Sequence, residues 1–328
     1  METSKVQSFK SPLVGEIFCC MANPTIKKMS FKSPLVGEIF CYQNEKIKIL
    51  CFAKNSYNHQ NFLKNMKIIS WNVNGIRAVE RKGAIQNLIE KYHPDLLFLQ
   101  EIKGTPDKFS AYLNAPEGYE AFYNPAEKAG YAGTGVWIKN EIRKYVDSVQ
   151  TGFEGDPTAN EGRVSHVILE KNDKIFDIFG IYFPNGGKSS EAWDEKLIFY
   201  ANFSKKMDAL RDAGHFVLWG GDINCAHNEI DLSRPKENDG KIGFHPAERA
   251  WLDDRAANDW KDIWRVQNPT TEMYSWWDQK TKARERNIGW RIDAFWGESQ
   301  IFAATKNIEY LTEHLGSDHC PILIEVEF

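Results

Sequence analysis

Short apolar runs alternate with amphipathic stretches from residue 66 to the end of the chain, and this alternation predicts the secondary structure. The runs rich in branched and aromatic residues predict strands over 66–72, 95–101, 120–123, 135–138, 165–169, 176–182, 216–221, 289–293 and 321–328. Apolar residues at helical spacing predict helices over 81–92 and 191–213 and from Pro246 onwards, and leave 226–244 as a loop. Short strands interspersed with helices indicate a layered α/β fold.

Polar residues stand at the ends of the strand-like runs 66–72, 95–101, 216–224, 289–293 and 316–319. They are Asn72, Glu101, Asp222, Asn224, Asp293, Asp318 and His319. Because the strands of a sandwich deliver side chains to one rim, residues this far apart in sequence can form a single site. Carboxylate and amide oxygens suit a hard cation such as Mg²⁺, and such a cation assists the cleavage of phosphodiesters. The pattern predicts metal-dependent hydrolysis of a phosphate ester.

Residues 1–65 differ from the rest of the chain. The segment SFKSPLVGEIFC occurs at 8–19 and again at 30–41, and all 11 Trp residues lie after residue 65. Two copies are too few for a solenoid. The net charge is +5 for residues 1–65 and –9 for residues 66–328, so any basic surface that binds phosphate groups has to be local. We expect 1–65 to be a poorly ordered N-terminal extension, with a partner-binding arm as the alternative, and 66–328 to be the catalytic domain.

Six motifs in the second part of the chain carry a family resemblance. They are SWNVNGIRA (70–78), LQEIK (99–103), YFPN (182–185), GGDIN-x-A-H-x-E-I-D-L (220–232), GWRID (289–293) and GSDHCP (316–321). Together they resemble the exonuclease III family of apurinic/apyrimidinic (AP) endonucleases, part of a wider endonuclease/exonuclease/phosphatase superfamily, over 263 of 328 residues. The resemblance implies a four-layered α/β sandwich, in which two mixed sheets pack face to face with helices on both outer sides.

The resemblance also implies a metal site. Its candidate ligands are Asn72, Glu101, Asp222, Asn224, Asp318 and His319, with Glu101 as the principal ligand of Mg²⁺ or, as an alternative ion, Mn²⁺. From the residues alone, Glu101 could instead end its strand by pairing with Lys103, and Asp222, after two glycines, could be a turn residue. The presence of several oxygen donors at strand ends favours the metal site.

Catalysis is expected from Tyr182, Asp222, Asn224, Asp293 and His319. Asp222 and Asn224, two residues apart on an extended segment, would present a carboxylate and an amide on one side. His319 beside a buried Asp293 would be held in one tautomer and favoured as the imidazolium. Whether Asp222, His319 or Tyr182 acts as the general base stays open.

A further group of residues is expected to bind DNA. It comprises Asn185, Lys188, Trp276, Lys280, Trp290 and Ile292. In the resemblance, Trp276, Trp290 and Ile292 match a small apolar pocket for a flipped abasic sugar, although Trp residues are also common in cores. Lys188 and Lys280 stand where animal-type relatives carry an Arg and a Met that wedge into the duplex, and Lys stacks poorly on bases.

The expected enzyme is a DNA repair nuclease that cuts double-stranded DNA 5′ to an abasic site and acts at 3′ ends as a 3′→5′ exonuclease or 3′-phosphodiesterase. The alternatives are another phosphoesterase of the superfamily, such as a non-specific nuclease or an inositol phosphatase, and an inactive DNA-binding module. Cys225 and Cys320 are interpreted as packing thiols, and no apolar run reaches the ~20 residues of a membrane helix. We expect a soluble, intracellular monomer, in the cytoplasm or nucleoid of a bacterium or in the nucleus or an organelle of a eukaryote.

Overall fold

The computed structural model describes residues 65–327 and five strands within residues 1–64. The chain divides into two units, Met1–Phe62 and Leu63–Phe328. In the first unit, both copies of the repeated segment form antiparallel strand pairs, β1 (Val6–Ser11) with β2 (Gly15–Cys20) and β3 (Met29–Ser33) with β4 (Gly37–Tyr42), and β4 also pairs with β5 (Leu50–Lys54). The remainder of 1–64 lies outside the described residues, so the poorly ordered extension over 1–65 stays a prediction.

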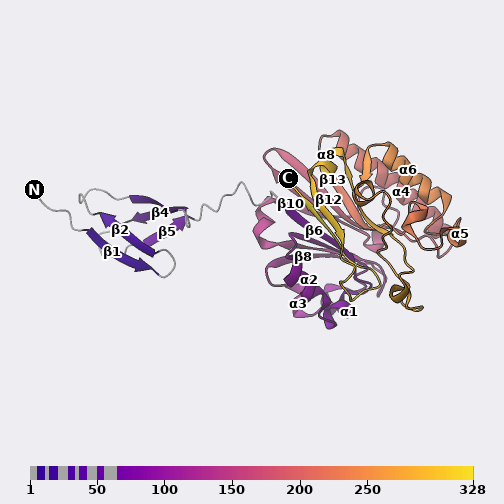
Figure 1. Cartoon of the computed structure of the whole chain (residues 1–328), viewed down its shortest axis with the longest axis horizontal. Helices are drawn as coiled ribbons and strands as arrows, with labels where there is room; N and C mark the ends of the chain where they lie inside the picture. The colour runs from indigo at the N-terminus through magenta and orange to yellow at the C-terminus, as the bar shows by residue number, and fades with distance from the viewer. Residues whose placement is uncertain are drawn as a thin grey trace, which may run out of the picture. The chain divides into compact units, whose positions relative to one another are not determined.

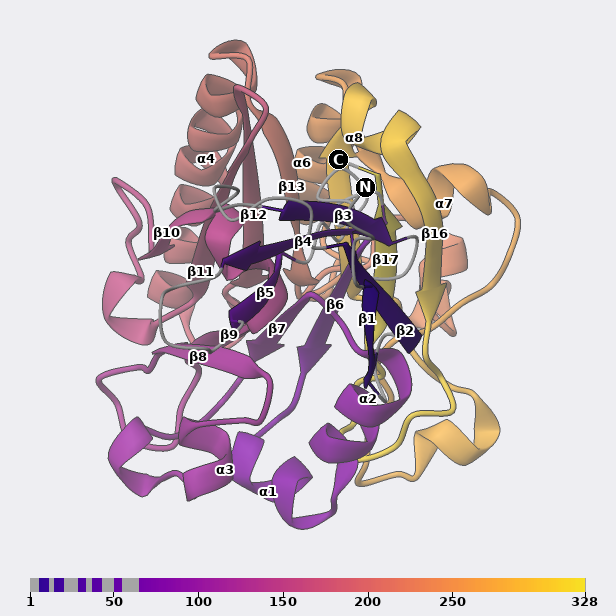
Figure 2. The same ribbon diagram turned by 90° about the vertical axis from the view of Figure 1, so that its left-hand side faces the viewer.

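Two six-stranded mixed sheets form the second unit (Figure 1). The first sheet has the order β10 (Val146–Thr151), β11 (Val164–Lys171), β12 (Lys174–Tyr182), β13 (Phe216–Asp222), β15 (Asp293–Glu298) and β14 (Trp260–Asp262). The second has the order β16 (Thr305–Tyr310), β17 (Ile322–Val326), β6 (Met66–Asn72), β7 (Leu96–Gln100), β9 (Thr134–Lys139) and β8 (Tyr119–Asn124). Each of these two sheets contains one parallel pair of strands, β12 with β13 in the first and β6 with β7 in the second, and Figure 2 shows β6 and β7 running in the same direction. The other neighbouring strands of the two sheets are antiparallel.

Helices cover the outer face of each sheet, so the unit has four layers (Figure 1). The second sheet is covered by α1 (Ile76–Arg81), α2 (Ala84–Tyr92) and α3 (Ala111–Asn114), and the first by α4 (Ser190–Asp212) and α6 (Pro246–Ala257). The short helices α5 (Pro235–Asn238), α7 (Ile263–Gln267) and α8 (Ser299–Ala304) lie in connections. Alternate side chains of each strand point to opposite faces. Phe98 and Leu218 therefore pack between the sheets, while their neighbours in sequence, Leu99 and Trp219, pack against helices.

This architecture is the four-layered sandwich that the resemblance implies, and most predicted elements are present. The long helix and the helix from Pro246 are confirmed, the former with Ser189 as its N-cap. Both Cys225 and Cys320 are buried free thiols, as predicted. Within the described part of the chain, no helix is both long and apolar enough to span a membrane.

Several element boundaries predicted from sequence are wrong. The helix predicted over 81–92 is α2 and begins only at Ala84, because Gly83 before it adopts a left-handed conformation, and the preceding helix α1 was not predicted. The run 289–293 is not a strand: β15 begins at Asp293 and continues to Glu298. The run 316–319 is a loop before β17, and the loop over 226–244 contains α5. The strands β10, β14 and β16 were not predicted, because their exposed or short segments lack a clear apolar alternation.

Candidate active site

The two sheets bring polar strand ends to one rim of the sandwich. Asn72 ends β6 and Asp222 ends β13, and each continues the inward-facing series of its strand. Asp293, the first residue of β15, lies opposite Asp222 in the antiparallel register. Gly221 precedes Asp222 with φ +136°, and a Cβ there would lie 2.0 Å from the Ile181 carbonyl oxygen. Only glycine therefore lets β13 approach β12 closely enough to place Asp222 at this rim.

An acidic cluster occupies the rim. Glu101, Asp222 and His319 each offer one ligand atom, and these atoms lie within 4.8 Å of one another. Asn72 Nδ2 donates to both Glu101 Oε1 and Asp222 Oδ2, each at 2.8 Å. Glu101 also pairs with Lys103 at 2.6 Å, so the strand-end ion pair and the acidic cluster occur together. Carboxylates at this separation, joined by an amide, could hold a divalent cation.

His319 is oriented by Asp293. Its Nδ1 lies 2.8 Å from Asp293 Oδ2, and its Nε2 lies 3.9 Å from Asp222 Oδ2, so the ring stands between the two acids. Asp293 is fixed in turn by Ser275 Oγ, which donates to Oδ2 at 2.6 Å, and by the Tyr310 hydroxyl, which donates to its carbonyl oxygen at 2.7 Å. The arrangement leaves the Nε2 edge of the imidazole facing the acidic cluster.

The protonation of these groups follows from burial and neighbouring charge. Burial alone would lower the pKa of His319, but the charge and hydrogen bond of Asp293 outweigh it, and the pKa rises to about 10. Burial, followed by the charge of Asp293, raises the pKa of Asp222 to about 7. Burial, followed by the charge of Glu101, raises the pKa of the Tyr182 phenol well above 10. Near neutral pH, His319 and Tyr182 can therefore donate hydrogen bonds, and Asp222 can gain or lose a proton.

Asn224 is placed differently from the prediction. The segment after Asp222 is not extended, because Asn224 adopts a left-handed conformation with φ +50° and its N–H donates to Asp222 Oδ1 at 2.9 Å. Its side-chain Nδ2 donates to the Phe183 carbonyl, and its Oδ1 accepts from Asn185 Nδ2 at 3.0 Å. A turn rather than strand alternation thus brings the amide beside Asp222.

Asp318 lies next to the cluster and is held by three side-chain donors, one of which is Ser317 Oγ at 3.1 Å from its Oδ1. Its Oδ1 accepts from Asn74 Nδ2 at 2.9 Å and its Oδ2 from Trp276 Nε1 at 3.2 Å. Burial raises its pKa, but the charge of His319 and these hydrogen bonds outweigh it, and the pKa is lowered. Asp318 is therefore an anion near neutral pH.

A cavity of about 340 Å³ opens at the rim. Its polar side contains Glu101, Tyr182, Asn185, Asp222, Asn224, Asp318 and His319, and its apolar side contains Trp276, Trp290, Ile292 and Ile242. Trp276 and Trp290 pack with Leu232, Phe244 and Ile292 in a small cluster separate from the main core, whereas Trp277 belongs to that core. The three apolar residues predicted to form a pocket thus share one cavity with the acids.

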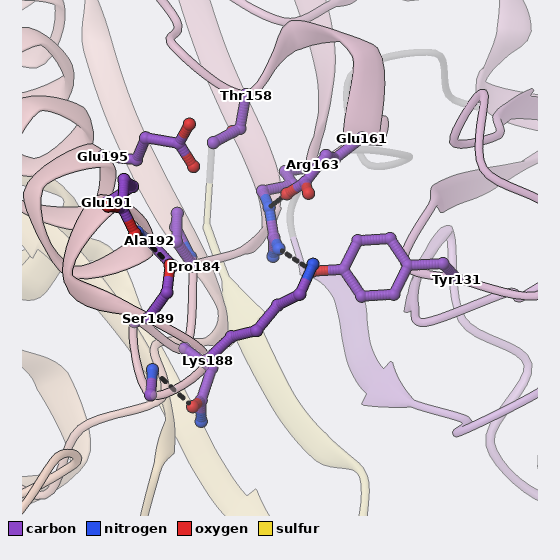
Figure 3. A pocket seen from close by; sticks show the side chains of 13 residues that line it. Tyr131, Thr158, Glu161, Arg163, Pro184, Lys188, Ser189, Glu191, Ala192 and Glu195 are labelled. Carbon is purple, nitrogen blue, oxygen red and sulfur yellow. Dashed lines mark hydrogen bonds and ion pairs between the residues drawn. The ribbon is translucent and has the colours of Figure 1, made fainter.

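A second cavity, of about 230 Å³, adjoins the first and shares Asn185 with it (Figure 3). Arg163 projects into it beside Tyr131, yet is buried: it donates to the carbonyl oxygens of Tyr182 and Phe183 and stacks on the Tyr182 ring at 4.6 Å. Arg163 therefore supports Tyr182. Lys188, also in this cavity, is exposed, whereas Lys280 is exposed on a loop outside both cavities.

Several residues of the site were not identified from sequence. Ser275 and Tyr310 contact the predicted site residue Asp293 through hydrogen bonds across the fold, Tyr131 accepts a hydrogen bond from Arg163, and Ile242 joins the cavity wall from within a polar loop. None of them stands at the end of an apolar run, so the strand-end pattern gave no signal for them.

Comparison with known proteins places this geometry in a family. The profile described as the Endonuclease/Exonuclease/phosphatase family matches residues 69–319. An exodeoxyribonuclease of Bacillus subtilis is 34% identical over 264 residues, covering 78% of this chain and 98% of the relative. A DNA-(apurinic or apyrimidinic site) endonuclease of Dictyostelium discoideum is 34% identical over 272 residues, covering 80% of this chain and 71% of the relative.

The fold is similar to solved structures of the same group. The AP endonuclease LMAP of Leishmania major superposes with a TM-score of 0.72 at 25% identity, covering 84% of this chain and 92% of that structure. The 3′ phosphatase NExo of Neisseria, bound to a product DNA hairpin, gives a TM-score of 0.70 at 25% identity, with coverages of 80% and 100%. The chain therefore belongs to the endonuclease/exonuclease/phosphatase family and, within it, to the branch of exonuclease III and the AP endonucleases.

Proposed function

We propose that this protein is a Mg²⁺-dependent DNA repair nuclease that hydrolyses the phosphodiester 5′ to an abasic site in double-stranded DNA, with 3′→5′ exonuclease or 3′-phosphodiesterase activity at 3′ ends. The observation that carries the proposal is one cavity lined both by acids and hydrogen-bond donors and by the large apolar side chains of Trp276, Trp290 and Ile292. An enzyme for abasic DNA needs both, because it must attack a phosphate and also accommodate a sugar without a base. The exodeoxyribonuclease and AP endonuclease relatives support this reading.

The acidic cluster fits a hard divalent cation. Glu101 and Asp222 offer anionic oxygens of the kind that suits Mg²⁺ or Mn²⁺, and the Asn72 amide nitrogen holds the two carboxylates together by donating to both. We assign Glu101 as the principal ligand, with Asn72, Asp222 and Asp318 beside it. A bound ion would supply charge neutralisation for the phosphate in the transition state.

The remaining polar residues are assigned to the phosphate and the attacking water. Asp222, which accepts hydrogen bonds from Asn72 and the Asn224 N–H, is the proposed acceptor of the water proton. His319 and Tyr182 are the proposed donors to the phosphate oxygens, with Asp293 holding His319 in position. His319 acts here as a donor rather than a metal ligand, because an imidazolium cannot bind a cation, and Asn224 is assigned to the phosphate as a donor beside Asp222.

DNA recognition is assigned to the apolar wall and to nearby exposed groups. Trp276, Trp290 and Ile292 would surround a base-free sugar and leave too little room for a base. Asn185, Lys188 and Lys280 would contact backbone phosphates, and the two exposed lysines would do so as point charges.

One assay tests the proposal and separates it from its alternatives. The full chain is incubated with a duplex that contains one abasic analogue, with Mg²⁺ and with EDTA, and in parallel with an undamaged duplex and an inositol phosphate. We expect Mg²⁺-dependent cleavage 5′ to the abasic site, lost in EDTA and in Asp222→Asn. Preferred hydrolysis of the inositol phosphate, or equal cleavage of any duplex, would favour another phosphoesterase of the family. Binding of DNA without cleavage of any substrate would indicate an inactive module.

A further inference from the structure

An ion pair between Lys196 of α4 and Glu248 of α6 lies in the interior next to the active-site cavity. Both side chains have 0% exposure. The Lys196 ammonium donates to Glu248 Oε1 and, at 3.2 Å each, to the carbonyl oxygens of Asn185 and Asn224. An ammonium group has three hydrogens, so all of them are used by these acceptors.

The second oxygen of Glu248 binds a third segment of the cavity wall. Oε2 accepts from the N–H of Gly243 at 2.8 Å and of His245 at 2.9 Å. Asn185, Asn224 and Gly243 all line the cavity. The pair therefore bonds to the backbone of three separate segments that form the site, immediately behind the residues that face the substrate.

We propose that Lys196 and Glu248 are positioning residues that set the geometry of the Asn185 and Asn224 side chains. Asn185 Nδ2 donates to Asn224 Oδ1, so two side chains in mutual contact are each held at the backbone by one ammonium group. The inference rests on the proposed function, in which these amides contact the phosphate and the reacting water.

The local sequence is adapted to this contact. Gly186 follows Asn185 with φ +79°, and a Cβ there would lie 3.0 Å from Lys196 Cδ and 3.3 Å from Trp193 Cε3. A side chain at this position would push the Asn185 segment away from the lysine. The glycine thus permits both the turn and the approach of the Asn185 carbonyl to the ammonium.

The packing of α4 against α6 does not by itself require the buried ion pair between Lys196 and Glu248. The two helices already contact through apolar residues of one cluster and through a second ion pair, Arg255 Nη1 to Asp208 Oδ2 at 2.9 Å. Burying charges is costly, and an apolar pair of similar size is often as stable. An apolar pair could not satisfy the two carbonyls and the Gly243 N–H in the loops of the site, or the N-cap N–H of α6 at His245.

The test compares two double variants that each remove one α4–α6 ion pair. Lys196→Met with Glu248→Gln removes the pair beside the cavity and leaves no unpaired buried charge. Arg255→Met with Asp208→Asn is the matched control, since it joins the same helices about 18 Å further along α4. The measurements are the melting temperature, kcat and KM on abasic duplex, and the NMR signals of the Asn185 and Asn224 side-chain amides, assigned from Asn185→Asp and Asn224→Asp.

We expect the first variant to lower kcat about tenfold to a hundredfold with little change in KM, because small misplacements of catalytic groups cost this much. The two amide signals should shift in that variant and stay in place in the control, which should keep native kcat. Unmoved amide signals, or equal shifts and equal losses of kcat in the control, overturn the proposal. If the unaltered protein does not cleave abasic DNA, the proposed function fails, and the amide signals alone decide whether the pair positions the two asparagines.

Discussion

Replacement of Asp293 by Asn tests whether the charge of His319 is needed for catalysis. The Asp293 carboxylate accepts from His319 Nδ1 at 2.8 Å and is itself buried. Asn is nearly isosteric and can still accept from Ser275, so the fold should persist. What is lost is the negative charge that keeps the imidazole protonated.

The size of the effect follows from the pKa of His319. That pKa is about 10 with Asp293 in place, against an ordinary value of 6.5, and Asp293 is the foremost influence that raises it against burial. Without the carboxylate, burial still lowers the pKa while Asp222 and Asp318 still raise it, so we expect it to fall towards the ordinary value of 6.5. At about pH 7.5, roughly one molecule in ten would then carry the proton, since each unit changes the protonation ratio tenfold. The kcat of Asp293→Asn should therefore be about tenfold or more below that of the unaltered protein at this pH.

The assay measures kcat on abasic duplex for both proteins from about pH 6 to 9 at saturating Mg²⁺. The quantity of interest is the kcat of Asp293→Asn divided by the kcat of the unaltered protein. The ratio should rise as the pH falls, because acid restores the imidazolium in the variant while His319 of the unaltered protein is charged throughout. Asp293 also raises the pKa of Asp222, so its removal keeps Asp222 ionised at lower pH, which moves the ratio in the same direction. A ratio that is constant across this range would refute the reasoning and leave Asp293 a purely geometric role.

Three further predictions address the metal, the cavity and the N-terminal segment. Glu101→Gln should raise the Mg²⁺ concentration for half-maximal activity about tenfold or more, because an amide lacks the charge a hard cation prefers; normal cleavage at low Mg²⁺ would exclude Glu101 as the ligand. Trp290→Ala should lower the ratio of abasic-site cleavage to exonuclease activity about tenfold, and a constant ratio would make Trp290 an ordinary packing residue. Lys280→Ala should instead weaken the binding of every duplex and make that binding less dependent on salt concentration. Deletion of 1–65 should leave kcat and the melting temperature almost unchanged, and a large fall in the melting temperature, measured by calorimetry, would show that this segment packs on the catalytic unit.

The strand-end pattern located much of the site because it depends on local sequence. Asn72 and Asp222 follow apolar runs that are buried on both faces, and such runs mark central strands whatever their partners. Central strands share a rim, so the residues that end them meet. Asn72, Glu101 and Asp222 do converge within hydrogen-bonding or metal-binding distance, as the pattern predicts, whereas His319 joins them from the loop before β17.

The same pattern failed where an apolar run serves a cavity rather than a sheet. Trp290 and Ile292 alternate with polar residues in 289–293 and resemble a strand, yet they form a cavity wall, and the strand begins only at Asp293. Asn224 shows a related failure, since its left-handed backbone places the amide through a turn. In 289–293 a long-range contact overrides the local preference, and no local rule contains that information, whereas at Asn224 the hydrogen bond to Asp222 Oδ1 two residues away sets the turn.

Buried charge is the feature for which sequence gives the least guidance. Lys196 and Glu248 each stand in a helix among other charged residues, where solvent exposure is the ordinary expectation. Their burial follows from the meeting of α4, α6 and the loops of the site, which presents the Asn185 and Asn224 carbonyls and the Gly243 N–H with no strand or helix to satisfy them, while the His245 N–H is bound as part of the capping box of α6. The loops that form the site are thus the cause of the buried pair, because irregular backbone in the interior requires side chains that can donate and accept. For the same reason, residues that control such a site are better sought among the buried partners of its loops than at the ends of its strands.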